Sequence, residues 1–587
     1  MVKLLQLQLL ILLAVYANGQ KARKNWQQKS QELEGDGTFG LCENEAGAWY
    51  YFRDYEGQES ACQKEVAKVK YSNQINETGW AFVEVEIAQR MIPPYKQGYA
   101  AGFVEGRATR DLIRLHLSNT VDGFCDGAAH FCEDLNEYLL SNYLWMMDNI
   151  ASYPEDRYWL QVNMTLNQLM GMIDGYEGKL GQNLGIEQIV THPIYLIQLA
   201  GDIEDLAVKF GKPETQRSQL TGTGHCSALV KLLPDMSDIY FSHVTWASYS
   251  SMLRMQKRYT FALGEPGRSY AFSSYPASIS SVDDFIVTSA RLAILETTIS
   301  NYNERLLRFM TPSSVLCWVR TQVAHRLSSS GLQWAKIFSK FNSGTYNNQW
   351  SILDYKMFRK GREDHPSHGL LHVLEQLPNH TAHADMTHVL LRNFYWPSYN
   401  TPYFPKIFKW SDGDKMVKKF GDWYSYDRTP RARIFRRDHG SVVDMDSMIK
   451  LMRSNNYTKD PLSRCDCNPP YSAENAISCR SDLNPENGTY PFPSLGYRDH
   501  GATDMKVTNS RLIETLSFTA IAGPTHDPTP VFDWTTTPFE SIVPHNGQPT
   551  RWTWFRFEPV THRWSTSLYG AHFAENDQQP EQDFSLL

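Results

Sequence analysis

Hydrophobic residues between Gln97 and about Lys209 recur mostly at intervals of three and four residues. The clearest series is Phe131, Leu135, Leu139, Tyr143 and Met146. This spacing places apolar side chains on one face of a helix, so the segment predicts several packed helices. Directly before it, residues 80–87 alternate between apolar and polar with a period of two, which predicts a strand.

Beyond residue 225 the pattern changes to short β-rich runs divided by turn residues. We expect strands at residues 227–233, 239–246, 284–289, 292–299, 350–355 and 552–557. Helical spacing returns at residues 305–310 and 445–453. The chain has no internal repeat and no low-complexity tract.

A turn cluster at residues 234–238 joins the first two of these strands into a hairpin. If the turn centres near Met236, Cys226 lies opposite Trp246, within two residues. His243, Thr245 and Trp246 then return to Cys226, although side chains alternate along a strand and the three cannot all point the same way. The alternative is that His243 and Trp246 are ordinary sheet residues.

The composition suits a dense globular protein and argues against disorder: 42% of the 587 residues are hydrophobic and 13% are aromatic. The net charge of −7 comes without acidic or basic blocks, so nothing indicates a nucleic-acid partner. Length alone leaves the number of domains open.

The first nineteen residues have a basic start, a short apolar centre and small residues at 17–19, which predicts a secretory signal peptide. No apolar run of about 18 residues follows, so we expect a soluble, lumenal mature chain rather than a signal anchor. Five sequons support this route, at Asn76, Asn163, Asn379, Asn456 and Asn487. Secretion and a lysosome-like compartment both remain open.

Nine cysteines in an oxidising compartment leave at least one thiol unpaired. Cys125 and Cys132 are close enough to close a small loop. One pair is expected among three cysteines that share a Pro- and Asn-rich loop, namely Cys465, Cys467 and Cys479. A zinc site there is disfavoured because no second paired-thiol motif occurs.

Cys226 lies far from the other cysteines and follows a polar, Gly-rich segment, residues 211–225, that predicts an exposed linker tolerant of cleavage. If the bond between His225 and Cys226 is cut, Cys226 carries both a thiol and a free α-amine, a nucleophile and a base on one residue. The alternative is a buried structural thiol.

The sequence resembles the phospholipase B-like family of lysosomal and secreted proteins. The similarity runs over nearly the whole mature chain, with matching segments at residues 223–234, 242–246, 295–299, 344–350, 354–356, 375–378, 430–435 and 475–485. It implies an N-terminal-nucleophile hydrolase, with an α+β fold built as a four-layer αββα sandwich. Self-cleavage would then give fragments 20–225 and 226–587, which stay together as one body.

The resemblance also implies roles for individual residues. Cys226 would attack the substrate carbonyl while its α-amine shuttles the proton. Asn348 resembles a side-chain donor to the developing oxyanion, and Arg431 resembles a pocket arginine that lowers the pKa of the thiol. The alternatives are a turn asparagine and a surface arginine. His243 and Trp246 resemble pocket residues.

Thr298 is a further pocket candidate, with a plain strand position as the alternative. The function implied is removal of fatty acyl groups from glycerophospholipids through a thioester, without metal or cofactor but with transient contact with lipid surfaces. An N-acyl-amide or peptide hydrolase and a catalytically silent lipid-binding protein are the alternatives. Six histidines between residues 365 and 388 form no metal motif, and no serine-lipase elbow occurs. The oligomeric state is open.

Overall fold

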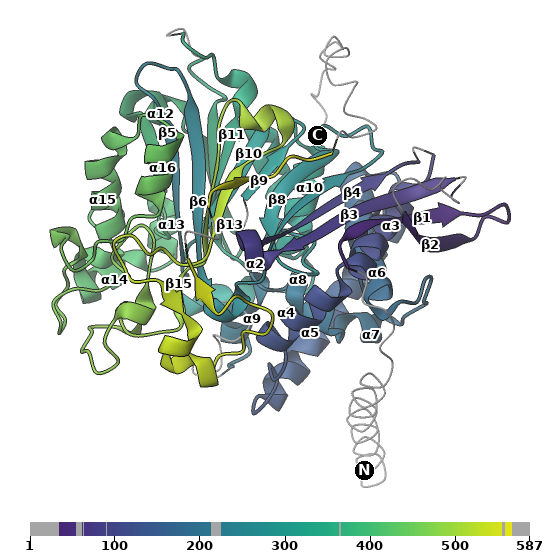
Figure 1. Ribbon diagram of the computed structural model, residues 1–587, viewed down its shortest axis with the longest axis horizontal. Coiled ribbons are helices and arrows are strands. Elements are labelled where there is room, and N and C mark those ends of the chain that lie inside the picture. The colour runs from purple at the N-terminus through teal and green to yellow at the C-terminus, as the bar shows by residue number, and fades with distance from the viewer. Residues whose placement is uncertain are drawn as a thin grey trace.

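A computed structural model describes residues 35–54, 62, 64–89, 91–212, 225–283, 285–362, 366–553 and 558–565. The predicted signal peptide, residues 1–19, and most of the Gly-rich segment before Cys226 lie outside this part of the chain. Helices and sheets are combined throughout, so the α+β expectation is confirmed (Figure 1).

The larger sheet contains eleven strands, antiparallel throughout except where β4 pairs in parallel with β7. In spatial order the strands are β13 (His380–Asp385), β12 (Leu371–Leu377), β11 (Asn348–Asp354), β10 (Leu292–Thr298), β9 (Phe285–Thr288), β8 (Ser269–Ser274), β7 (Arg254–Thr260), β4 (Trp80–Ile87), β3 (Glu65–Gln74), β1 (Gly37–Glu43) and β2 (Trp49–Asp54).

The smaller sheet contains seven strands and carries Cys226. Its order is β14 (Tyr395–Ser398), β5 (His225–Leu232), β6 (Ile239–Ser248), β16 (Asp504–Thr508), β17 (Thr519–Ala522) and β20 (Val560–Thr561), with β15 (His500–Ala502) also paired to β6. A separate short ribbon joins β18 (Phe532–Asp533) and β19 (Arg551–Trp552).

Seven consecutive helices occupy the predicted helical segment: α3 (Pro94–Ala108), α4 (Arg110–Thr120), α5 (Ala129–Ser152), α6 (Arg157–Glu177), α7 (Ile186–Val190), α8 (Pro193–Gln198) and α9 (Asp202–Lys209). A short α2 (Ile75–Thr78) precedes them. The later helices are α10 (Cys317–Leu327), α11 (Gly331–Phe338), α12 (Thr387–Asn393), α13 (Pro405–Trp410), α14 (Gly413–Phe420), α15 (Pro430–Asp438) and α16 (Met445–Met452).

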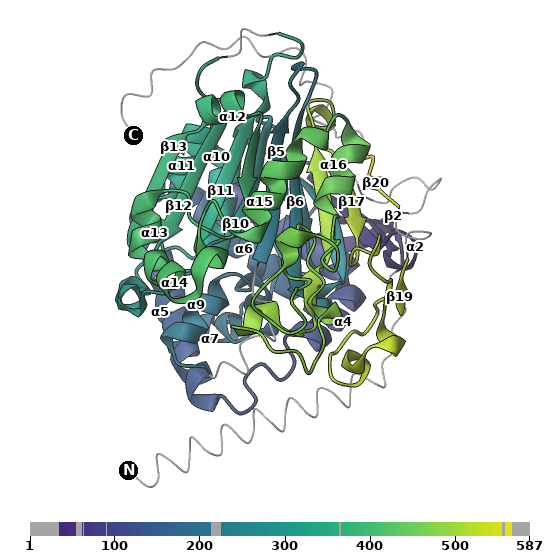
Figure 2. The ribbon, with the colours of Figure 1, turned by 90° about the vertical axis from the view of Figure 1, so that its left-hand side faces the viewer.

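The two sheets face each other across a shared hydrophobic core (Figure 2). Phe285 of the larger sheet lies 6.0 Å from Phe241 of the smaller sheet and 5.3 Å from Phe518, measured between ring centroids. Helices α3 and α11 pack on the larger sheet, while α16 packs on β5, β6 and β16 of the smaller sheet. The space between the sheets is therefore closed to water over most of its area.

The local pattern predicted most of the strands around Cys226. The strand at residues 80–87 and the hairpin of β5 and β6 are confirmed, with Cys226 opposite Thr245, one residue from the expected partner. One expectation needs correction, because residues 305–310 fall in a 3₁₀ helix, Glu304–Phe309. Of the strand expected at 552–557, Trp552 belongs to β19, and residues 554–557 lie outside the described residues.

The cysteines pair as Cys125–Cys132 and Cys465–Cys467, as expected for the two clusters, and as Cys42–Cys62, which was not anticipated. Cys479, one of the three candidates in its loop, keeps a free thiol. Cys226 and Cys317 also form no disulfide, and all three of these cysteines are buried. Three cysteines therefore lie outside disulfides, which agrees with the expectation of at least one.

Candidate active site

Cys226 is the second residue of β5, and both of its backbone polar groups are held by distant side chains. Its N–H donates to Oδ1 of Asn400 at 3.0 Å, and its carbonyl accepts from Nη1 of Arg431 at 2.5 Å. The side chain is 3% exposed and forms no disulfide. The start of β5 is thus fixed from two sides, directly after the Gly-rich segment.

Asn400, which sequence reasoning missed, links the two sheets at this point. Besides accepting from Cys226, its Nδ2 donates to the carbonyl of Thr298 on β10 at 2.7 Å. Its backbone lies in the left-handed region with φ of 69°, a conformation that asparagine tolerates better than most residues. The only local signal was an asparagine ahead of Thr401-Pro402 in an aromatic-rich loop, which is typical of many turns.

Arg431 lies behind the strand, not on the pocket side. Near the start of α15, its buried guanidinium donates to the carbonyl of Tyr399 at 3.0 Å and to Oγ of Ser227 at 3.3 Å. The same group lies 4.3 Å from the ring centroid of Trp246. Burial lowers the pKa of Arg431 to about 10, so the side chain remains a cation at neutral pH. The alternative of a surface arginine is therefore wrong.

The thiol itself is strongly disfavoured as an anion. Burial raises the pKa of Cys226 well above its ordinary value, and the nearby Glu296 carboxylate raises it further. A backbone hydrogen bond from Trp246 and the Lys506 ammonium act in the opposite direction but do not outweigh them. In the uncut chain the thiol is therefore neutral, and attack on a carbonyl needs a base nearby.

His243 and Glu296 flank this thiol. Among Sγ of Cys226, a ring nitrogen of His243 and a carboxylate oxygen of Glu296, all distances are within 4.8 Å. Burial lowers the pKa of His243 well below its ordinary value, so the imidazole is neutral. Glu296 accepts from the Tyr346 hydroxyl at 3.0 Å.

Asn348, the predicted oxyanion donor, is directed at Glu296. In the amide orientation that satisfies its neighbours, its nitrogen donates to Oε2 of Glu296 at 3.0 Å and to the carbonyl of Asn347 at 2.9 Å. Asn348 opens β11 opposite Thr298 of β10, and its side chain is buried. Asn348 therefore lies next to Glu296, which flanks the Cys226 thiol, and its amide is bound to the Glu296 carboxylate.

A buried network of four charges lies behind Thr245, the residue opposite Cys226. Arg254 binds Asp283 at 2.5 Å and Asp504 at 2.7 Å, while Nζ of Lys506 binds both carboxylates at 2.8 and 2.9 Å. Lys506 also donates to Oγ1 of Thr245 at 2.5 Å. Two cations and two anions cancel here, which makes their full burial tolerable. Sequence patterns gave no sign of this network.

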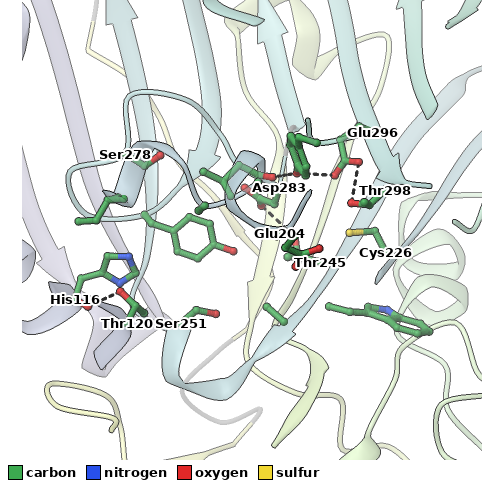
Figure 3. Close-up of a pocket in the computed structure, with 18 residues that line it drawn as sticks. His116, Thr120, Glu204, Cys226, Thr245, Ser251, Ser278, Asp283, Glu296 and Thr298 are labelled. Carbon is green, nitrogen blue, oxygen red and sulfur yellow. Dashed lines mark hydrogen bonds between the residues drawn. The ribbon is translucent and has the colours of Figure 1, made fainter. Parts of the chain in front are cut away.

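A pocket opens from Cys226 between the sheets towards the N-terminal helices α4, α8 and α9 (Figure 3). The space between its walls is about 710 Å³, part of which is open to solvent, and the walls are largely apolar. Its lining residues are His116, Thr120, Ile197, Ala200, Gly201, Glu204, Cys226, Thr245, Trp246, Ala247, Ser251, Tyr275, Ser278, Val282, Asp283, Glu296, Thr298 and Tyr346. Figure 3 shows the Cys226 sulfur beside Thr298, with Glu296 adjacent to both.

The predicted pocket residues are thus only partly brought together. Cys226, Trp246 and Thr298 line the pocket. His243 lies beside the Cys226 thiol but is not among the residues that line the pocket. Four predicted sequon asparagines are exposed, whereas Asn163 is half-buried on α6 and accepts from Asn167 at 2.8 Å. His225 belongs to β5, but its side chain lies outside the described residues.

These features define a mixed α+β protein with a buried, unpaired cysteine at the start of a core strand and at the wall of a largely apolar pocket. The family model for phospholipase B matches residues 67–562. The chain therefore belongs to the phospholipase B-like family.

Three relatives illustrate the range of similarity. "Putative phospholipase B-like 1" of Caenorhabditis elegans is 59% identical over 91% of this chain and 94% of its own. "Putative phospholipase B-like 2" of Homo sapiens is 45% identical over 85% and 86%, and "Phospholipase B-like protein B" of Dictyostelium discoideum is 34% identical over 87% and 88%. In the part of the chain that the structure describes, no helix has the length and hydrophobicity needed to cross a bilayer.

Proposed function

We propose that this protein is a phospholipase B-like acyl hydrolase in which scission of the His225–Cys226 bond creates the nucleophile. The observation that carries the proposal is Cys226: an unpaired thiol at the start of a core strand and at the wall of a pocket. The names of the relatives support an ester substrate. Two facing sheets with helices packed on their outer surfaces agree with a four-layer αββα sandwich of the N-terminal-nucleophile type.

The chemistry follows from the neutral thiol. Sγ of Cys226 attacks the ester carbonyl carbon, and its proton passes to the new α-amine, whose ordinary pKa is about 8. The tetrahedral intermediate collapses to a thioester, and the departing alcohol takes the proton from the ammonium. Water, deprotonated by the same amine, then attacks the thioester, which releases the fatty acid and restores the thiol.

Two asparagines are candidates to stabilise the oxyanion. Asn348 is the residue implied by resemblance, but its amide already donates to Glu296. The amide of Asn400 also has an acceptor already, the carbonyl of Thr298, but its Oδ1 accepts from the N–H of Cys226, so Asn400 contacts the reacting residue directly. We propose Asn400 as the main donor and Asn348 as a residue that positions Glu296.

Arg431 is proposed to hold the start of β5 in place, because it binds the carbonyl of Cys226 and the hydroxyl of Ser227. We place the protein in a secretory or lysosomal lumen, on the strength of the predicted signal peptide and of four exposed sequon asparagines. Fragments 20–225 and 226–587 are proposed to remain one body after the cut.

A second candidate, hydrolysis of an N-acyl amide or peptide, is favoured by the charge of the pocket. Its described lining includes the carboxylates Glu204 and Glu296, together with Asp283, whose charge Arg254 and Lys506 cancel, but neither lysine nor arginine. A phosphate group gains nothing from such a wall, whereas an amine-bearing substituent does. A catalytically silent lipid-binding protein is the third alternative.

The test begins with the purified secreted protein and its Cys226→Ala variant. Intact mass and N-terminal sequencing should find a chain that starts at Cys226 in the wild type alone. Mature protein should then release fatty acid from phosphatidylcholine faster than from N-acylethanolamines, in a thiol-dependent reaction. Faster amide cleavage would favour the second candidate. Lipid binding without turnover, unchanged by Cys226→Ala, would favour the third. An active protein that is unbroken at residue 226 would overturn the mechanism.

A further inference from the structure

We propose that Cys226, His243 and Glu296 form a binding site for a soft divalent cation, with Zn²⁺ as the best match, and that the bound ion blocks the thiol. Sγ, a ring nitrogen and a carboxylate oxygen of these residues lie within 4.8 Å of one another. They come from β5, β6 and β10, so the site spans the two facing sheets.

The ligand types fit this ion. Zinc is commonly bound by thiolate sulfur, imidazole nitrogen and carboxylate oxygen, and sites with three protein ligands keep a fourth position for water. A thiolate and a carboxylate together cancel the charge of a divalent cation, so a bound ion would be neutralised in this buried space. Magnesium and calcium prefer an all-oxygen environment, which a thiol and an imidazole do not supply.

His243 is the second, independent indication of a ligand. Its side chain is 0% exposed, and neither ring nitrogen forms a well-aligned hydrogen bond with any described residue. One nitrogen approaches the backbone carbonyl of Glu296. A metal-binding histidine typically directs its second N–H at such a carbonyl, which leaves the other nitrogen for the ion.

Charges around the site would not expel a cation. Lys506 and Arg254 are each bound to the carboxylates of Asp283 and Asp504, so this network is neutral as a whole. A third cation, Arg431, binds the backbone carbonyl of Cys226 and the hydroxyl of Ser227, the next residue along the strand. Glu296 accepts from the neutral groups Tyr346 and Asn348, which orient its carboxylate.

A second group of the same residue types provides a natural control. Glu474, Cys479 and His500 also lie within 4.8 Å of one another and are buried. There, however, the thiol donates to Glu474 at 3.0 Å, and Arg498 forms an ion pair with the same carboxylate at 3.1 Å. A guanidinium at that carboxylate opposes a second cation, so we expect no ion at this group.

The binding site uses only the side chain of Cys226 and does not need the chain to be cut. Inhibition by the ion, in contrast, rests on the proposed function of Cys226 as nucleophile. A sulfur atom that donates one lone pair to zinc is a weaker nucleophile than the free thiolate, and the ion occupies part of the space that a substrate carbonyl would need. Binding and inhibition can therefore be tested separately.

The binding experiment dialyses the full purified protein against Co²⁺, a spectroscopic substitute for Zn²⁺, and then against Zn²⁺ with metal analysis. We expect one equivalent of Co²⁺ with sulfur-to-cobalt charge-transfer absorption, displaced by Zn²⁺. Cys226→Ser should abolish the absorption. His243→Gln and the nearly isosteric Glu296→Gln should each weaken binding by about tenfold or more. Cys479→Ser and Cys317→Ser should bind as the wild type does.

Thermal unfolding of each variant checks that the fold is kept. The proposal is overturned if the wild type binds no Co²⁺, if folded His243→Gln and Glu296→Gln bind as tightly as the wild type, or if the absorption disappears in Cys479→Ser. Zn²⁺ should also stop fatty-acid release, and a chelator should restore it. A protein that binds Co²⁺ through Cys226 but hydrolyses nothing would refute the proposed function and leave the metal site intact.

Discussion

Cys226 shows how strongly a site depends on what surrounds one side chain. Burial and Glu296 both hold its thiol in the neutral form, while burial also keeps the adjacent His243 uncharged. The two residues therefore do not form the thiolate–imidazolium ion pair by which a charged imidazole activates a cysteine in other enzymes. A base created on Cys226 itself by chain scission is the simplest way to complete the chemistry.

At this scale the two asparagines give the first prediction. Asn400→Asp keeps an oxygen for the Cys226 N–H but removes the amide donor, which also binds the Thr298 carbonyl, and aspartate tolerates the left-handed backbone. We expect kcat of the mature enzyme to fall by about 10²–10³-fold, as for other oxyanion donors. Asn348→Ser should cost less. Steady-state kinetics on both variants measures the two losses in kcat. A larger loss of kcat in Asn348→Ser than in Asn400→Asp would show that Asn348 is the main oxyanion donor.

The residues of the site were predictable to different degrees. Cys226, Trp246 and Thr298 lie in local patterns, and the structure places all three at the pocket. Asn400 was missed because it is 174 residues away from its partner, and a loop asparagine carries no periodic signal. Glu296 was not singled out either, because a strand glutamate is read as a solvent-facing residue until a second sheet is known to cover it.

At the scale of elements, glycines bring α3 and α6 into direct backbone contact. Gly98, Gly102 and Gly106 on α3 face carbonyl oxygens of α6, and Gly171 and Gly175 on α6 face carbonyl oxygens of α3. A methyl group at any of these positions would overlap a carbonyl oxygen of the partner helix. This close pair of helices packs on the larger sheet through α3.

Gly102→Ala is therefore expected to lower the free energy of unfolding by about 1–3 kcal/mol or more, because the added methyl group meets the Gln168 carbonyl. Urea unfolding in a Cys226→Ala background, where every sample is a single chain, measures this. Gly264→Ala is the control, since no atom lies within 4 Å of the added methyl group. Equal stability of the two variants would contradict the packing argument.

Glu375 of β12 binds the backbone of the segment that follows Asn400. Its carboxyl group accepts from the backbone N–H groups of Tyr403 and Phe404 and from Gln349. Burial nevertheless raises its pKa from an ordinary value of about 4.5 to about 7, since desolvation outweighs these hydrogen bonds. The carboxyl is thus protonated in the folded chain at a pH where the unfolded chain has lost this proton.

Because the pKa of Glu375 is higher in the folded chain than in the unfolded chain, its protonation stabilises the fold by up to about 3 kcal/mol. This contribution is complete below about pH 4.5 and is lost as the pH rises to about 7. Glu375→Gln cannot titrate, so wild type should lose stability relative to this variant between about pH 4.5 and 7. Urea unfolding of both proteins across this range measures the difference. A constant difference would show that the carboxyl is ionised in the folded state.

At the scale of the whole molecule, the two sides of the proposed cut are interleaved. Strands β1 to β4 precede Cys226, yet they continue the larger sheet through the parallel pairing of β4 with β7 over Trp80–Glu86 and Arg254–Thr260. The helices α4, α8 and α9 that line the pocket also precede the cut. Neither fragment has a complete core or a complete pocket without the other.

We therefore predict that the cut protein migrates as one body under native conditions and as two chains only after denaturation. Native mass spectrometry and size exclusion, compared with a denaturing gel, test this on the wild type. Cys226→Ala, which should remain one chain in both, is the control. Separation of the fragments without denaturant would show that the shared sheet is too weak to hold them.

The sequence by itself determined the helical segment before Cys226, the hairpin that returns Thr245 to it, and the family. These follow from local periodicity, turn residues and continuous motifs, which act over a few neighbouring positions. Only the tertiary structure decided that Asn400 and Arg431 bind the backbone of Cys226 and that Glu296 lies beside its thiol. The same holds for the neutralisation of Asp283 and Asp504 by Arg254 and Lys506. These contacts depend on how two sheets stack, and stacking is set by the packing of the whole core, which no local pattern encodes.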